Sequence, residues 1–108
     1  MRHERIRNLE ATESTDLAGN HRKLTVTAEI EVGSTAETPK LAETVPQGIN
    51  PQILLLDLTI EGGGIGADVM TWKSARFEKE VSENQHQSVE ILVDGNSLAS
   101  ATVQVIHS

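Results

Sequence analysis

The chain of 108 residues contains no cysteine, and this absence excludes several kinds of site. Without cysteine there is no disulfide, no thiol nucleophile and no cysteine-ligated zinc or iron–sulfur centre. The same absence fits a reducing compartment. The N-terminal arginines are not followed by an apolar run, so no signal peptide is expected. No stretch approaches the ~20 apolar residues of a transmembrane helix, so a cytoplasmic location is the default expectation.

Aromatic residues and positive charge are also scarce. The chain has Trp72, Phe77 and no tyrosine, so it offers few aromatic rings on which bases or sugars could stack. Sixteen acidic residues stand against nine basic ones, which gives a formal net charge of −7. This balance argues against nucleic acid or an anionic membrane as a partner, because phosphate binding needs a basic face. The core must consist mainly of leucine, isoleucine, valine and alanine.

No arrangement of residues typical of catalysis or metal binding is present. The histidines stand at positions 3, 21, 86 and 107, without the spacing of a metal site, and no nucleophile elbow occurs. We therefore predict no catalytic residue, no metal and no cofactor, and we expect a protein that is not an enzyme. A hydrolase or isomerase of unfamiliar type is the opposing hypothesis. It would require a buried carboxylate or histidine with a strongly perturbed pKa.

Three stretches show the alternation of apolar residues that predicts β-strands. Residues 53–60 (ILLLDLTI) carry an apolar row at even positions and more apolar side chains on the other face, which is typical of a strand inside a sheet. Residues 24–32 have one apolar and one polar face. Residues 89–93 and 98–106 alternate on either side of Asp94-Gly95, which predicts a hairpin.

Two parts of the chain leave alternatives open. In residues 1–22, Ile6 and Leu9 stand at helical spacing, but alternate positions from 3 to 11 fit an edge strand equally well, and part of this segment is expected to be mobile. Residues 33–52 hold all three prolines and predict a long connection. Leu41, Val45 and Ile49 within it are spaced by four. This spacing fits either a short helix or a loop whose three apolar side chains pack against the domain.

The glycine-rich stretch 61–66 predicts a turn. An aspartate and no Lys-Ser/Thr pair follows its glycines, so a phosphate-binding loop is not expected. We predict that residues 65–72 return from this turn as the partner strand of 53–60. Residues 74–87 favour a strand followed by a polar connection, with a short helix as the alternative.

Six strands and a candidate seventh at the N-terminus predict an all-β domain over residues 23–108. The expected fold is an antiparallel β-sandwich, with an immunoglobulin-like arrangement suggested by strand number. A curled sheet covered by one helix from residues 34–45 is the alternative.

Five apolar residues fall on strand faces that should contact water, and together they predict an interaction surface: Leu55, Met70, Trp72, Leu92 and Ile106. Residues 33–52, a second copy of the chain or another protein are the three candidates for covering it. The leading functional hypothesis is a non-enzymatic module for protein–protein interaction or structural assembly. The alternative is a domain that binds a small ligand or carbohydrate with loops 33–52 and 61–66.

Overall fold

The computed structural model describes residues 5–15, 21–62, 69–82 and 85–106. These residues form seven β-strands and no helix, which confirms the all-β prediction. The strands are β1 (Arg5–Thr15), β2 (Arg22–Val32), β3 (Glu37–Glu43), β4 (Ile53–Gly62), β5 (Thr71–Glu80), β6 (Ser88–Val93) and β7 (Asn96–Ile106). Among the described residues, no helix has the length and apolarity needed to cross a bilayer.

The seven strands belong to one mixed sheet with the order β3-β4-β6-β7-β1-β2-β5. Four of its pairings are antiparallel, but β1 pairs with β7 and β4 pairs with β6 in parallel. The expectation of a purely antiparallel sheet was therefore wrong, and the sandwich with immunoglobulin-like topology is not confirmed. Alternation of side chains shows which face of a strand is buried, but it carries no information about the direction of the neighbouring strand.

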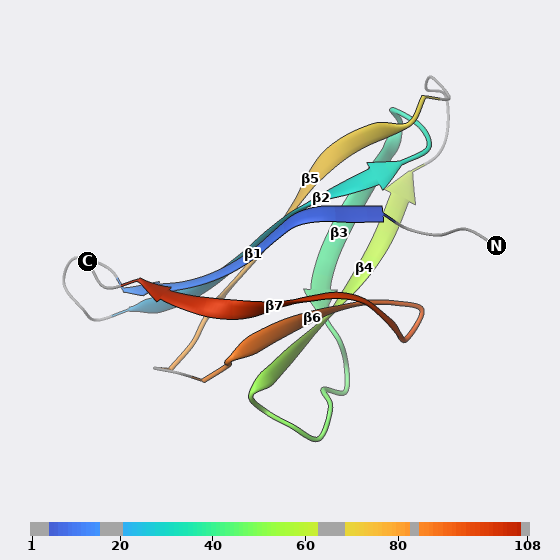
Figure 1. Cartoon of the computed structure of the whole chain (residues 1–108). Helices are drawn as coiled ribbons and strands as arrows, with labels where there is room; N and C mark the ends of the chain where they lie inside the picture. The colour runs from blue at the N-terminus through green and yellow to red at the C-terminus, as the bar shows by residue number, and fades with distance from the viewer. Residues whose placement is uncertain (1–4, 16–20, 63–68, 83–84, 107–108) are drawn as a thin grey trace.

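The sheet curls until its two outer strands, β3 and β5, lie close together, so that it is nearly closed into a barrel (Figure 1). Two lysines of β5 span this seam. The Lys73 ammonium group donates to the backbone carbonyls of Thr35 and Glu37 at 2.6 and 2.5 Å. Six residues further along, Lys79 forms an ion pair of 3.1 Å with Glu43. These contacts show that β3 and β5 run in the same direction along the seam.

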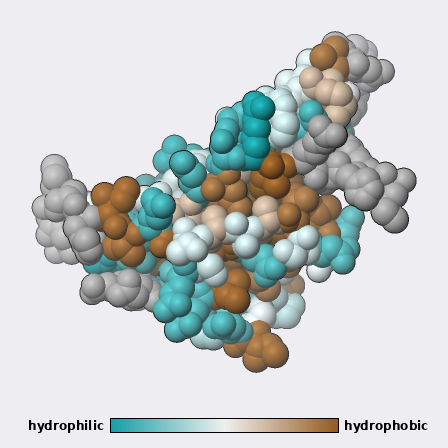
Figure 2. All heavy atoms as spheres, viewed as in Figure 1, coloured by the Kyte–Doolittle hydropathy of each residue, from teal (hydrophilic) through white to brown (hydrophobic). Residues whose placement is uncertain are grey.

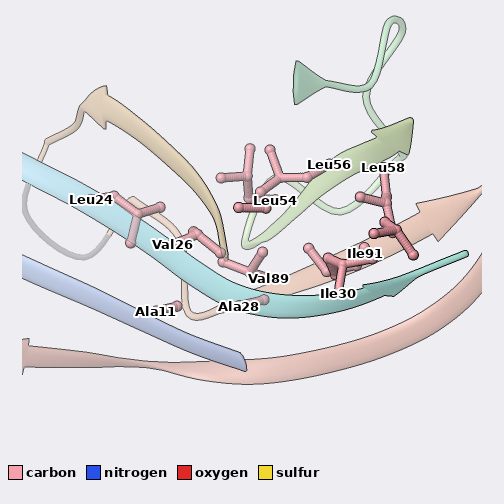
Figure 3. Packing of buried hydrophobic residues seen from close by; sticks show 12 residues of the cluster. Ala11, Leu24, Val26, Ala28, Ile30, Leu54, Leu56, Leu58, Val89 and Ile91 are labelled. Carbon is pink, nitrogen blue, oxygen red and sulfur yellow. The ribbon is translucent and has the colours of Figure 1, made fainter. Parts of the chain in front are cut away.

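Alternate residues of the strands fill the interior of this curled sheet (Figure 3). All five even positions of β2 from Leu24 to Val32 are buried, as the alternation predicts. The other buried apolar side chains come from four further strands: Ala11, Leu54, Leu56, Leu58, Ala75, Val89 and Ile91. The buried cluster consists of leucine, isoleucine, valine and alanine, as the composition predicts.

The N-terminal strand β1 lies inside the sheet, between β7 and β2, and not at an edge. Its register with β2 shifts between Arg7 and Glu10, and Asn8 within this bulge has a φ of 53°. The extra residue breaks the alternation, which explains why the sequence left strand and helix open here. Residues 1–4 and 16–20 lie outside the described part, and mobility within 1–22 stays a prediction.

Residues 33–52 contain strand β3 and no helix, so the helix suggested for 34–45 was wrong. Among the strands, β3 forms a ladder with β4 alone, and its buried Pro39 pairs with Ile60. Proline lacks the N–H that a central strand would need and is tolerated at such an outer position. The strand leaves residues 44–52 as the connection to β4.

The prediction that residues 65–72 pair with β4 was also wrong, because both edges of β4 are occupied by β3 and β6. Strand β5 instead pairs with β2, which confirms a strand over the first part of 74–87. Gly62 has a φ of 94°, and a side chain there would collide with the Ala36 carbonyl oxygen. Residues 63–68, which hold most of the glycine-rich stretch, lie outside the described part.

The predicted hairpin between β6 and β7 is present. Asp94 and Gly95 both have positive φ, at 52° and 81°, and Val93 faces Asn96 directly across the turn. Positive φ at both central residues is the conformation for which Asp-Gly is selected in two-residue hairpins.

Candidate interaction surface

The 44–52 loop, which joins β3 to β4, is tied to β4 by a side chain that takes the place of a strand. The Gln47 carboxamide accepts a hydrogen bond from the Leu55 N–H at 2.9 Å and donates to the Leu55 carbonyl at 2.9 Å. The same amide nitrogen donates to the Thr44 carbonyl at 2.7 Å. Gln47 therefore continues the ladder of β4 beyond the end of β3 and occupies the Leu55 N–H, which would otherwise be open to another chain.

Further hydrogen bonds fix both ends of this loop. The Thr44 hydroxyl donates to the Asp57 carboxylate at 2.9 Å, and the Thr44 N–H donates to the Leu55 carbonyl at 3.0 Å. At the other end, the Asn50 side chain accepts from the Gln52 N–H at 3.0 Å. A loop with this many anchors has few conformations to lose when it contacts a partner.

The loop nevertheless presents apolar side chains to solvent. Ile49 is 104% exposed and Val45 is 89% exposed, the two largest values among the exposed large apolar residues of the described chain. Figure 2 shows an apolar protrusion at the bottom of the view, where Figure 1 places the connection between β3 and β4. From the sequence, these two residues were expected either to form part of a helical turn or to hold the loop against the domain. The structure gives that role to Gln47 and leaves Val45 and Ile49 outside.

A shallow depression of about 330 Å³ lies where the loop meets the sheet. Ile49 and Gly48 form its loop side, and Ile53, Leu55 and Glu90 form its sheet side, with Asn50 between them. Gly48 lies so close over Leu55 that an added Cβ would be 3.2 Å from the leucine Cδ1. The loop thus covers part of Leu55, one of the five predicted surface residues. We call Val45, Ile49, Ile53 and Leu55 the loop surface.

Two of the five predicted residues, Leu55 and Leu92, lie near each other on the outer face of neighbouring strands. In the parallel ladder, Leu55 is opposite Glu90 and Asp57 is opposite Leu92, so the two leucines stand one step apart diagonally. Both are half-buried. The structure brings this pair together beside the loop surface.

The other three predicted residues lie elsewhere. Met70 precedes β5 and is 64% exposed, and Ile106 at the end of β7 is 51% exposed. Trp72 lies on β5, opposite Glu31 of β2, and the Arg7 guanidinium stacks over its ring at 4.0 Å from the centroid. One face of the single tryptophan is therefore already covered by a cation of the same chain.

The surroundings of Trp72 are rich in paired charges. The Asn8 amide donates to the Glu29 carboxylate at 2.7 Å and Arg7 donates to it at 3.0 Å, and these bonds lower the pKa of Glu29 below its ordinary value. Hydrogen bonding and attraction by Lys23 and Arg76 likewise lower the pKa of Glu78 on β5. The carboxylates of Glu29 and Glu78 thus already have basic partners within the chain.

A second group of polar residues, which the sequence reasoning missed, lies inside the sheet where β1, β3 and β5 end. Glu13 of β1 is 1% exposed and forms an ion pair of 2.8 Å with Arg22 of β2. Glu13 lies on the same face of β1 as the buried Ala11, because it is two residues further along the strand. Among the described residues, no group of three or more histidine or acidic side chains is placed to hold a metal ion.

The buried His86 belongs to the same end of the barrel. Its Nδ1 lies 2.9 Å from the Pro51 carbonyl, which can only accept, and its Nε2 lies 3.3 Å from the Lys79 ammonium group, which can only donate. Nδ1 can therefore donate to the Pro51 carbonyl while Nε2 accepts from the Lys79 ammonium group. Lys79 also pairs with Glu43. The histidine therefore holds the 44–52 loop, through Pro51, against β5.

The described parts of the two loops proposed for ligand binding lie at opposite ends of β3 and β4. Gly62 is opposite Glu37 at one end of the β3–β4 ladder, whereas the 44–52 loop follows Glu43 at the other. Strand β3 separates them.

Comparison with protein-family models, with curated proteins and with solved structures gave no match. The geometry of the molecule alone therefore carries the functional argument.

Proposed function

We propose that this domain is a non-enzymatic module that binds another protein through the loop surface. The observation that carries the proposal is the full exposure of Ile49 on a loop that is otherwise firmly anchored by Gln47. Burial of one isoleucine side chain contributes roughly 1.5–3 kcal/mol. Because the loop is already ordered, little of that gain is lost to ordering it on binding.

Two further observations favour a different protein over a second copy of the chain. A symmetric dimer brings the same residues of both copies together. Glu90 borders the loop surface, and Asp57 lies two residues beyond Leu55 on the same face. A symmetric contact here would bring like charges together, which is destabilising.

The alternative of carbohydrate binding has less support. Sugar recognition commonly uses an exposed aromatic ring, and Trp72 lies on β5 beneath Arg7, away from the depression. The described parts of the two loops lie at opposite ends of β3 and β4, so they give no support to a shared pocket.

The proposal is tested by selecting random dodecapeptides displayed on phage against the immobilised full chain. Retained peptides are then measured against the Ile49→Ser variant and, as a control, against Met70→Ser, a similarly exposed apolar residue before β5. We expect Ile49→Ser to weaken binding about tenfold or more and Met70→Ser to leave it unchanged. Both variants should unfold like the wild type in a thermal scan, because both side chains are exposed.

Two results would contradict the proposal. In the first, no peptide is retained above the level of uncoated support. In the second, the retained peptides bind the Ile49→Ser variant as tightly as the wild type.

A further inference from the structure

Three neighbouring strands beside the loop surface, β4, β6 and β7, contain no lysine or arginine. No lysine or arginine occurs in residues 41–72 or in residues 80–108, which include all of β4, β6 and β7. On the neighbouring strand β3, Lys40 is opposite Thr59 of β4. Thr59 lies two residues beyond Asp57, the residue of β4 that is opposite Leu92. The nine basic residues of the chain therefore all lie in β1, β2, β3, β5 or the N-terminal residues.

Glu90 occupies the centre of this cation-free face. It is half-buried on β6 and borders two depressions at once, the one beside the 44–52 loop and a second of about 270 Å³ over β4, β6 and β7. Ile53 is the other residue that both depressions share. Among the residues that the structure describes, none forms an ion pair or a side-chain hydrogen bond with Glu90.

This isolation contrasts with the opposite side of the molecule. There, the carboxylates of Glu29 and Glu78 accept hydrogen bonds from basic or amide side chains of the same chain. Glu29 of β2 and Glu78 of β5 therefore have cationic partners within the chain, whereas Glu90 has none among the described residues.

A partner that fills either depression must remove water from Glu90. A carboxylate that loses its water without gaining a counter-charge opposes binding strongly. An entirely apolar partner segment is therefore disfavoured at this surface, although the loop surface itself is apolar. The favourable occupant brings its own positive charge.

Building on the proposed binding function, we propose that the partner is a protein segment that combines an aliphatic side chain with a lysine or arginine. The aliphatic side chain packs between Ile49 and Leu55, and the basic side chain forms an ion pair with Glu90. The acidic net charge of the whole chain assists the approach of such a segment at low ionic strength.

The test uses the dodecapeptides retained by the wild-type chain in the selection described above. Their composition is compared with that of the starting library, and their dissociation constants are measured for the wild type, for Glu90→Gln and for Glu61→Gln at low and high salt. Glu61 is a matched control, because it is an exposed acid at the far end of β4 and its replacement changes the net charge equally.

We expect enrichment of lysine and arginine, and about threefold weaker binding to Glu90→Gln with a smaller salt dependence. Glu61→Gln should bind like the wild type. If retained peptides show no enrichment and bind Glu90→Gln unchanged while Ile49→Ser abolishes binding, this inference fails and the binding function stands. If Ile49→Ser weakens the binding of no retained peptide, both this inference and the proposed binding function fail.

Discussion

Replacing Leu56 with alanine is expected to lower the free energy of unfolding by about 3 kcal/mol. Leu56 is fully buried in β4, where it is opposite Ile91 of β6, and its side chain lies within the interior shared by five strands. Removal of its outer carbons forfeits their burial and leaves a cavity that the surrounding β-strands cannot easily collapse to fill. Such a loss is a large part of the stability of a domain of this size.

Chemical denaturation followed by the Trp72 fluorescence measures this effect. Thr59→Ala on the same strand is the control, because Thr59 is exposed and on the outer face. The control should change the unfolding free energy by less than about 0.5 kcal/mol. Equal effects of the two substitutions would show that Leu56 does not lie in a shared core.

Replacing Arg22 with methionine is expected to destabilise the protein by about 3 kcal/mol. The substitution removes the ion-pair partner of Glu13, whose side chain is 1% exposed inside the sheet. A carboxylate held away from water without its counter-charge is costly. Methionine retains most of the apolar volume of the arginine side chain, so the loss reports mainly on the charge.

A double-mutant cycle isolates this interaction. Glu13→Leu together with Arg22→Met removes both charges, and the double variant should be less destabilised than the sum of the two single variants by about 2 kcal/mol. Additive effects in equilibrium unfolding would mean that Glu13 and Arg22 do not interact in solution.

The strands with regular alternation could be predicted from sequence, because burial of one face is recorded directly in the spacing of apolar residues. This holds for β2, β4 and the β6–β7 hairpin, where Asp94-Gly95 also fixed the turn. The order of the strands could not be predicted. The two parallel pairings join strands that are distant in sequence, and no residue of either strand specifies such a neighbour.

Strand β3 was missed because Pro39 suggests a loop, although proline is compatible with the outer strand of a sheet. Leu55 and Leu92 were predicted as surface residues, because the alternation assigns them to the outer face. Ile49 was not predicted as a surface residue, because its exposure depends on the hydrogen bonds between the Gln47 amide and the backbone of Leu55. Hydrogen bonds from a polar side chain to a neighbouring strand do not change the spacing of apolar residues, so they cannot be predicted from that spacing.

Amide hydrogen exchange at Leu55 tests most directly whether the 44–52 loop is fixed on β4. The Leu55 N–H should exchange as slowly as those of β2, which is paired on both sides, and Gln47→Ala should accelerate it by about tenfold or more without affecting β2. Gln104→Ala, a change of the same exposed residue type on β7, should leave it slow. Rapid exchange at Leu55 in the wild type, or slow exchange that survives Gln47→Ala, would contradict the account.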